Sequence, residues 1–541
     1  MKTMKLVPQK VILILVSVLF GLFLLLPMTT ILVKSLSDGN DLTLSWYIAL
    51  LSEKIGRAFF NSVQISAASA MLAVFLAFMT AYAVNYTNLH GSFKKLISTV
   101  TMLPMLLPTI TYGFAIIYSF GKQGLVTKLL GTQMIDIYGI PGLLIGYVIY
   151  TLPTAFMLIS NTMQFIDKKF MIVSSLMGDS KARNFFNTVL TPLASTLAVA
   201  FIQSFTLSFT DYGIPAALAG NVDLLSTRLY NEMLGSLPNF HTGSAVSMLM
   251  LLPSVLSILL ITVLNRYNIR YTKISQVELR KDYVRDTVFG SLAVLIMASI
   301  VSIFAVIFVM PLVEQWPYRL NLSTDHVKGV FADAALMRVY GNSLLAAFLT
   351  ALIGTIVVYA CALVSARHNP YRKFGRLPDA IALITNTIPG MVLGVAYLMR
   401  FKGTVLHNSF AVLVICNIVH FFSSPYLMMK GSLEKLNASW ETTARLMGDS
   451  WLQTVMRIIT PNAVSTLLET FQYFFVNSMV TVSAVIFLVS TKTMVITAKI
   501  KELQHFASFN EIFVLSILIL LTNLLVKGVV KILTVKATKK G

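Results

Sequence analysis

Charged residues are scarce in this chain. Only 12% of its 541 residues are Asp, Glu, Lys or Arg, about half of the roughly 25% that soluble domains carry. Apolar residues reach 56% and form long runs at 11–33, 289–312 and 512–530. A helix of about 20 apolar residues crosses a hydrocarbon core of ~30 Å. The composition excludes a soluble domain and predicts an all-α polytopic membrane protein, since a membrane β-barrel would show short alternating strands.

Cysteine is nearly absent as well. Cys361 and Cys416 both lie in apolar runs, without a Cys-x-x-Cys spacing, which favours small buried residues over a disulfide or a metal site. His420 follows Cys416 by one helical turn, but two potential ligands fall short of the three or four that zinc requires. We therefore expect no metal site and interpret His420 as a core residue.

The motifs of nucleotide binding and hydrolytic catalysis are missing too. The sequence has no Gly-x-x-x-x-Gly-Lys-Ser/Thr, no His-Glu-x-x-His and no Gly-x-Ser-x-Gly, so the chain is not expected to hold ATP or to be an enzyme. Basic residues outnumber acidic ones by 42 to 22. Because Lys and Arg concentrate in the cytoplasmic loops of membrane proteins, this surplus does not indicate a nucleic-acid partner.

The apolar runs predict twelve membrane spans, six in each half. They cover residues 11–33, 59–84, 96–120, 141–163, 193–215, 243–265, 288–312, 340–366, 379–400, 408–429, 461–488 and 510–531. Clusters of Lys and Arg fall in every second loop and near both ends of the chain, which places both termini in the cytoplasm. We expect a first half at 1–265, a cytoplasmic linker at 266–287 and a second half at 288–541.

The two halves repeat each other. The dipeptide Asn-Ser at 61–62 recurs at 342–343, and Pro108 recurs as Pro389, both at an offset of 281 residues. Because each half has an even number of spans, both halves have the same orientation. We therefore expect a pseudo-twofold axis along the membrane normal, with a path for a solute at the interface between the halves.

A tetrapeptide, Met-Gly-Asp-Ser, also occurs twice, at 177–180 and 447–450, each time in a polar break between spans. The glycine suits the left-handed cap that ends one helix. The Asp or Ser after it can cap a second, amphipathic helix, which a Thr-Pro pair should stop. The pattern predicts two helix–Gly–helix hairpins, each with an exposed apolar ridge that fits a groove in a partner. The alternative is an amphipathic helix lying on lipid headgroups.

The candidate docking residues lie in both copies. They are Gly178, Asp179, Ser180, Phe185 and Pro192 in the first copy, and Glu441, Ala444, Gly448, Asp449, Ser450, Trp451 and Pro461 in the second.

The second copy resembles a known motif. Glu441-Thr-Thr-Ala444-Arg-Leu-Met-Gly448, thirteen residues before Pro461, is similar to the EAA loop of binding-protein-dependent ABC importer permeases. The first copy is degenerate, because residues 171–175 replace the acidic start and the Gly-to-Pro spacing is fourteen. The resemblance extends over nearly the whole chain, and the fused two-half arrangement is similar to type I importer permeases for iron(III), phosphonates and thiamine.

The resemblance implies a function and a set of partners. The chain would be the permease subunit of an ATP-driven importer, embedded in the lipid bilayer of the bacterial plasma membrane. Two copies of a separate ATPase subunit, which hold ATP and Mg²⁺, would dock on the two loops, and an extracytoplasmic binding protein would deliver the cargo. This chain itself would bind no cofactor. Iron(III) is the first candidate cargo, with 2-aminoethylphosphonate, thiamine or a polyamine as alternatives.

Candidate path residues lie in the fifth and eleventh predicted spans. They are Asp211, Tyr212, Asn477, Ser478 and Thr481. A carboxylate in a span must face protein or water, so Asp211 either lines the path or caps a helix end. An ion-coupled secondary transporter remains the alternative class. It would need ionisable residues within its spans, for which Asp211 and Glu469 are the main candidates.

Overall fold

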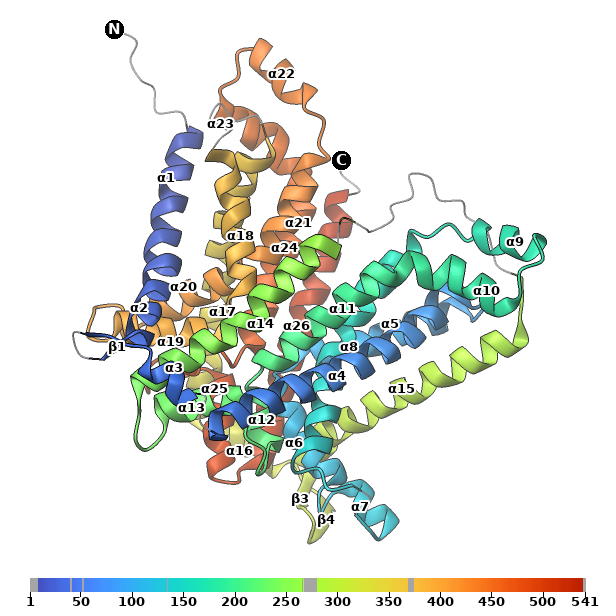
Figure 1. Ribbon diagram of the computed structural model, residues 1–541, viewed down its shortest axis with the longest axis vertical. Coiled ribbons are helices and arrows are strands. Elements are labelled where there is room, and N and C mark those ends of the chain that lie inside the picture. The colour runs from blue at the N-terminus through green and yellow to red at the C-terminus, as the bar shows by residue number, and fades with distance from the viewer. Residues whose placement is uncertain are drawn as a thin grey trace.

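The computed structural model describes residues 8–38, 41–50, 53–133, 135–264, 266, 280–367 and 374–538. These residues are almost entirely helical, with two short antiparallel β-hairpins (Figure 1). The hairpins pair β1 (Ser37–Asp38) with β2 (Asp41–Leu42), and β3 (Val313–Gln315) with β4 (Arg319–Leu322). The predicted all-α polytopic fold is confirmed.

The first half contains fourteen of the helices in the described residues. They are α1 (Pro8–Phe20), α2 (Leu26–Ser35), α3 (Ser45–Leu50), α4 (Glu53–Tyr86), α5 (Gly91–Met102), α6 (Thr109–Phe120), α7 (Leu125–Leu130), α8 (Ile140–Gln164), α9 (Lys169–Leu176), α10 (Lys181–Phe185), α11 (Thr191–Thr210), α12 (Gly213–Leu218), α13 (Leu225–Leu234) and α14 (Phe240–Leu264).

The second half contains twelve helices in the described residues. They are α15 (Tyr283–Val309), α16 (Asp325–Ala332), α17 (Ala334–Ala366), α18 (Leu377–Thr387), α19 (Gly390–Phe401), α20 (Phe410–His420), α21 (Ser423–Glu434), α22 (Ser439–Leu446), α23 (Trp451–Thr454), α24 (Thr460–Val480), α25 (Ile496–His505) and α26 (Phe509–Thr538).

The number of uninterrupted spans is smaller than twelve. Within the described residues, eight helical stretches are long and apolar enough to cross a membrane, and up to eleven if three bent helix pairs each count as one span. The bent pairs fall in the predicted spans 96–120, 379–400 and 408–429, with bends of 109°, 101° and 57°. The span predicted at 461–488 is outside this set, because α24 carries several polar side chains and ends at Val480.

Prolines cause two of the three bends. Pro108 and Pro389 each precede a helix, α6 and α19, and the residues before them, Leu107 and Ile388, are extended. A proline lacks the N–H that would continue the helix and disfavours helical geometry in the residue before it. The repeat noticed in the sequence therefore marks the same break in both halves.

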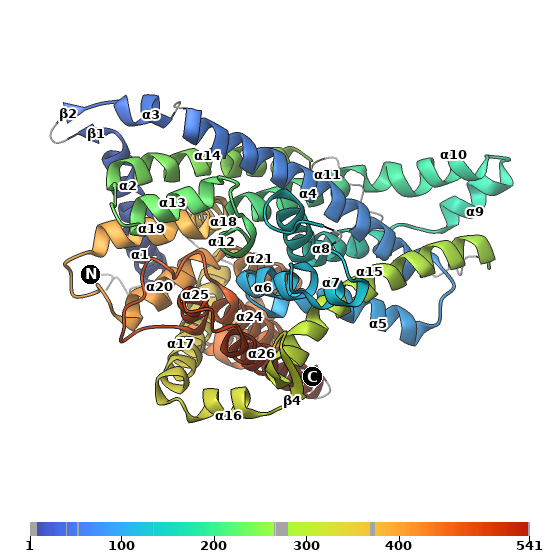
Figure 2. The same cartoon turned by 90° about the horizontal axis from the view of Figure 1, so that it is seen from below.

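The two halves are interlocked. The first helices of the first half, α1 and α2, pack against α17 and α19 of the second, while α15, the first helix of the second half, packs against α4, α5 and α6 of the first (Figures 1 and 2). Residues 265 and 267–279 of the predicted linker lie outside the described residues, and α15 begins at Tyr283. The division at 266–287 stays a prediction.

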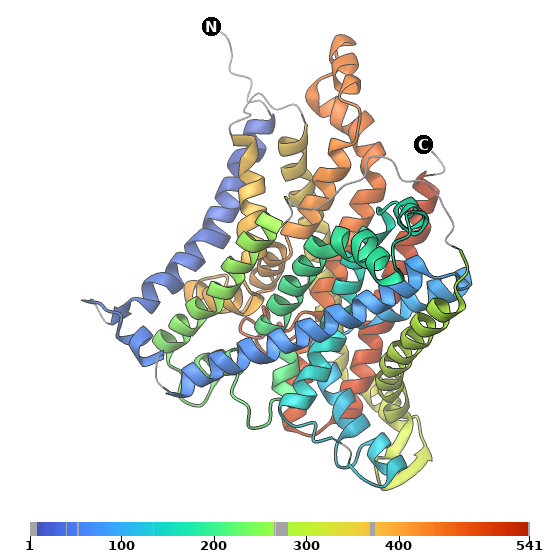
Figure 3. The same ribbon diagram turned by 45° about the vertical axis from the view of Figure 1, so that its right-hand side comes forward.

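The bundle has two distinct ends. In Figure 3 the orange segment, α22 with the start of α23, stands beyond the ends of the spans, and we call this the hairpin end. The short helices α12, α13, α16 and α25 lie at the other end (Figure 1), which we call the opposite end. The helices α9 and α10 project to one side of the bundle, beside the start of α15 (Figures 1 and 2).

Candidate functional site: two helical hairpins and a central cavity

The second Met-Gly-Asp-Ser copy ends α22 with a Schellman motif. Gly448 has φ +89°, its N–H donates to the Arg445 carbonyl at 3.2 Å, and the Asp449 N–H donates to the Ala444 carbonyl at 3.0 Å. These two bonds satisfy carbonyls that the end of a helix leaves free. The glycine is needed because other residues are strained at this positive φ.

A capping box then starts the next helix. Ser450 Oγ accepts from the Gln453 N–H, and the Gln453 side chain accepts from the Ser450 N–H at 2.8 Å. Reciprocal bonds of this kind satisfy two donors at a helix N-terminus. Arg457 lies 3.6 Å from Asp449 and joins the two arms of the hairpin.

The prediction that Thr-Pro stops the second arm is wrong. A π-helical turn at Val455–Ile459 leads directly into α24, with Pro461 in its first turn, and Phe186–Leu190 leads into α11 in the same way, with Pro192. The first turn of a helical segment tolerates proline, and the wider π turn shifts the hydrogen-bond register just before it. Each hairpin is therefore continuous with a long helix of its half.

A buried ion pair holds α22 against the bundle. Arg367 Nε, at the end of α17, lies 2.7 Å from Glu441 Oε1, and the two side chains are only 4% and 11% exposed. The same guanidinium donates to the carbonyls of Leu433, Leu436 and Asn437. The sequence pointed to Glu441 but placed Arg367 only in a basic cluster. Its separation from Glu441, 74 residues, gives no local signal.

The first hairpin is built to the same plan. Gly178 has φ +86°, and its N–H and that of Asp179 bond the carbonyls of Ser175 and Ser174, as in the second copy. Ser180 caps α10, and Ser174 donates to Asp179 at 2.7 Å. The pattern of exposed and buried residues over 171–180 is the same as over 441–450. Two degenerate sequences thus give one hairpin.

The anchor of the first hairpin is different. At the repeat offsets, Tyr86 and Met171 stand where the second half has Arg367 and Glu441, so the buried ion pair is replaced by uncharged residues. The Nζ of Lys168 lies 5.5 Å from the centre of the Tyr86 ring, a cation–π arrangement.

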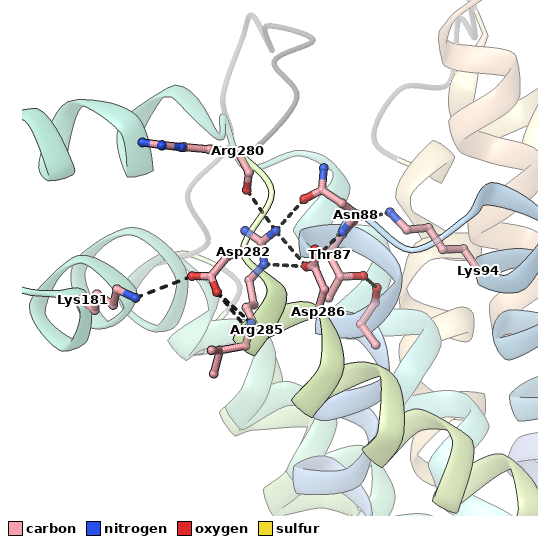
Figure 4. A network of polar contacts seen from close by, with 10 residues as sticks. Thr87, Asn88, Lys94, Lys181, Arg280, Asp282, Arg285 and Asp286 are labelled. Atoms are coloured by element: carbon pink, nitrogen blue, oxygen red, sulfur yellow. Dashed lines mark hydrogen bonds and ion pairs between the residues drawn. The ribbon is translucent and has the colours of Figure 1, made fainter.

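The first hairpin also contacts the start of α15, which belongs to the second half (Figure 4). Lys181 lies 3.7 Å from Asp282, which caps α15 by accepting from the N–H groups of Val284 and Arg285. These bonds, that from Arg285 foremost, lower the pKa of Asp282. The Arg285 guanidinium bonds Asn88 at 2.6 Å and Asp286 at 2.8 Å. This network joins α4, α10 and α15, so it crosses from one half to the other.

The exposed apolar surface of each hairpin comes mainly from residues other than those predicted. Trp451 and Phe185 are half-buried, Phe185 against the rings of Phe78 and Tyr82, and Val455 is buried. The exposed apolar side chains are instead Leu176, Met177 and Phe186 in the first hairpin and Leu446, Met447, Leu452 and Met456 in the second. Three pairs of these are 270 residues apart, so the two surfaces correspond.

A cavity of about 260 Å³ lies between the two halves. Its lining includes residues at equivalent positions of the repeat, 270 residues apart: Tyr150 with His420, Gln203 with Tyr473, and Leu207 with Asn477. The cavity also receives both ends of the break at Pro389 and many hydroxyl groups. It therefore lies where the pseudo-twofold axis was expected.

The predicted path residues divide into two groups. Asp211 and Asn477 line the cavity, while Tyr212, Ser478 and Thr481 are not among its lining residues. The Asp211 carboxylate accepts from Thr109 Oγ1 at 2.8 Å and from the Ile214 N–H at 2.8 Å. Asp211 therefore both lines the cavity and holds the start of α12. Tyr212 stacks on Tyr230, with 4.8 Å between ring centres.

Sequence reasoning missed several lining residues. His420, interpreted as a core residue, lines the cavity, and its Nδ1 is buried without a hydrogen-bond partner within the described structure. Tyr150, Gln203 and Tyr473 were not singled out. Their only signal is the repeat offset, which pairs them with one another and with His420.

Two interlocked halves, a shared cavity and twin hairpins define a two-half membrane permease, and the comparison with known families agrees. The family described as "Binding-protein-dependent transport system inner membrane component" matches residues 69–273 and 359–539. Because these two matches cover more than half of the chain, the chain belongs to this family. One match falls in each half, which confirms the fused two-half arrangement.

Individual relatives fit the same arrangement. The ferric transport system permease protein FbpB of Actinobacillus pleuropneumoniae is 23% identical over 88% of this chain and 71% of its own length. A putative ferric transport system permease protein, FbpB 1 of Haemophilus influenzae, is 23% identical over 87% and 77%. The thiamine transport system permease protein ThiP of Haemophilus influenzae is 22% identical over 66% and 68%.

Proposed function

We propose that this chain forms the translocation path of an ABC importer for iron(III). In this proposal the two hairpins dock on two copies of a separate ATPase subunit, and an extracytoplasmic binding protein delivers the cargo to the opposite end. The observation that carries the proposal is the double occurrence of one hairpin, with the same glycine turn and the same exposed apolar positions 270 residues apart. Two equivalent docking elements require two equivalent partners.

The orientation follows from charge. The basic clusters at the chain ends and in every second loop place both termini and both hairpins in the cytoplasm of a bacterial cell. The opposite end, with α13 and α25, then faces outward. Closure of the ATPase pair on ATP would move one half against the other about the central cavity.

Iron(III) is supported by the relatives and by the chemistry of the cavity. The two relatives that span most of this chain carry ferric transport in their names. The cavity lining is rich in hydroxyl and amide oxygens, with one carboxylate and one imidazole, and oxygen donors suit hard cations. A thiamine or phosphonate cargo remains the alternative, and one relative is named for thiamine transport.

A secondary transporter is supported less well. Glu469 is exposed on α24 and does not line the cavity. Each oxygen of Asp211 accepts a hydrogen bond from Thr109 or Ile214. Neither acid is therefore placed as a free proton or ion site within the interface.

Uptake into proteoliposomes tests the proposal. The chain is reconstituted with its ATPase and binding protein, and radioactive iron(III) is supplied outside. We expect uptake that requires ATP inside and the binding protein outside, and a complex of one permease with two ATPase subunits. Uptake by the chain alone, driven by an ion gradient and insensitive to ATP, would contradict the importer. Competition by thiamine or 2-aminoethylphosphonate but not by iron would contradict the cargo.

A further inference from the structure

The Asn-Ser dipeptide that opens α4 and α17 makes the same contacts in both halves. Ser62 Oγ on α4 accepts from the Leu225 N–H at 2.9 Å, and Ser343 Oγ on α17 accepts from the Ile496 N–H at 2.7 Å. Leu225 and Ile496 are the first residues of α13 and α25. Each serine therefore binds the N-terminus of a short helix at the opposite end of the bundle.

These short helices cannot cap themselves. The residues before them are Leu224 and Val495, whose aliphatic side chains accept no hydrogen bond. The first N–H groups of a helix have no partner within the helix, so a side chain from elsewhere must supply one. Ser62 and Ser343 are 4% and 6% exposed, so the bonds they accept are shielded from water.

The asparagines secure the segment just before each helix. Asn61 Nδ2 donates to the Asp223 carbonyl at 3.1 Å. Asn342 Nδ2 donates to the carbonyls of Lys492 at 3.1 Å and Met494 at 3.0 Å. Each dipeptide thus fixes both the approach and the first turn of its helix.

The segments held in this way meet across the interface between the halves. Gln504 on α25 donates to the Ala216 carbonyl of α12 at 3.0 Å. The ring of Tyr230 on α13 lies 6.2 Å from that of Phe487 and stacks on Tyr212, the neighbour of a cavity-lining residue. These contacts lie at the opposite end (Figure 1), where they close the interface beside the cavity.

We propose that the two Asn-Ser pairs are positioning residues of an outer gate that α12, α13 and α25 form. This inference rests on the proposed function, because the importer orientation makes the opposite end the outer one. α4 packs against α11, and α17 packs against α24, and α11 and α24 continue from the two hairpins. A movement of a hairpin then reaches the outer helix of the same half through its Asn-Ser pair.

The test measures access to the cavity from outside. A cysteine replaces the cavity residue in Asn477→Cys, while the natural cysteines are buried. A membrane-impermeant thiol reagent is added outside sealed vesicles without ATP. Asn342→Ala and Ser343→Ala should each raise the labelling rate about fivefold, which corresponds to the ~1 kcal/mol of one hydrogen bond. Ser343→Thr, which retains the hydroxyl, should restore slow labelling.

Matched controls separate gating from general destabilisation. Ser69 is a buried serine on α4 whose hydroxyl bonds its own helix, at the Ile65 carbonyl, so Ser69→Ala should leave labelling slow. Should Ser343→Ala fail to reach the membrane, the half-buried Asn342 and Asn61 carry the test through their alanine variants.

Two outcomes are kept apart. Unchanged labelling in well-folded Asn342→Ala and Asn61→Ala protein overturns the gate anchor, whatever the cargo. Loss of the proposed function is read separately, as absence of ATP-dependent uptake by the wild-type chain, and does not alter the labelling result.

Discussion

At the scale of single residues, Gly178 and Gly448 carry a constraint that comes from the backbone alone. A Cβ at either position would meet no atom within 4 Å, so packing does not exclude a larger side chain. The positive φ does, because L-residues other than glycine are strained there by about 1–2 kcal/mol. The sequence predicted this turn from the repeated tetrapeptide, since a Schellman motif is encoded locally.

Gly448→Val should therefore uncouple transport while the protein still inserts into the membrane. The strained turn would tilt α23 away from the direction that the capping box fixes, and the exposed side chains of Leu446 and Leu452 would no longer form one surface. ATPase pull-down and ATP-dependent uptake measure the effect, and we expect both to fall at least several-fold. Gly431→Ala is the control, because a Cβ there also has open space but lies within a helix. Normal uptake by Gly448→Val would contradict the coupling role of the hairpin.

At the scale of elements, the sequence predicted what is local and missed what depends on distant partners. Glycine turns, the Ser450 cap and the repeated proline positions could all be derived from short motifs. The inward position of Trp451 could not, because it depends on which face of a short helix meets the bundle. The π turns before Pro192 and Pro461 have no sequence signature in a single chain, and Arg367 is far from Glu441 in sequence.

The ion pair between Arg367 and Glu441 gives an element-scale prediction. Arg367→Ala would leave Glu441 buried without its partner, which costs about 3–5 kcal/mol, and would free the carbonyls at the end of α21. We expect earlier thermal unfolding in detergent and faster proteolysis within 437–450. The double variant Arg367→Tyr with Glu441→Met copies the first half and removes both charges. It should regain most of the stability, and equal instability of the single and double variants would contradict this account.

At the scale of the whole molecule, the function depends on the interlocking of two similar halves. Each half lends its first helix to the other, and the central cavity takes its lining from both. The repeat offsets predicted an interface of this kind. They could not predict the cavity lining in detail, because at least seven separate segments converge there and hydropathy does not encode which side chains point inward. The single charged network in Figure 4 adds a further contact between the halves at the first hairpin.

Orientation is the whole-molecule property that thiol labelling tests directly. Tyr283 begins α15 and Asn321 lies in β4, just beyond the other end of that helix, and both side chains are exposed. Because α15 crosses the membrane once, cysteines at these two positions must be labelled from opposite sides. The basic residues around 280–285 predict that Tyr283→Cys reacts only from the cytoplasm and Asn321→Cys only from outside. The buried Cys361 and Cys416 should stay unlabelled in the intact protein. Reversed labelling would place the hairpins outside the cell, away from any ATP-hydrolysing partner, and the importer would have to be abandoned.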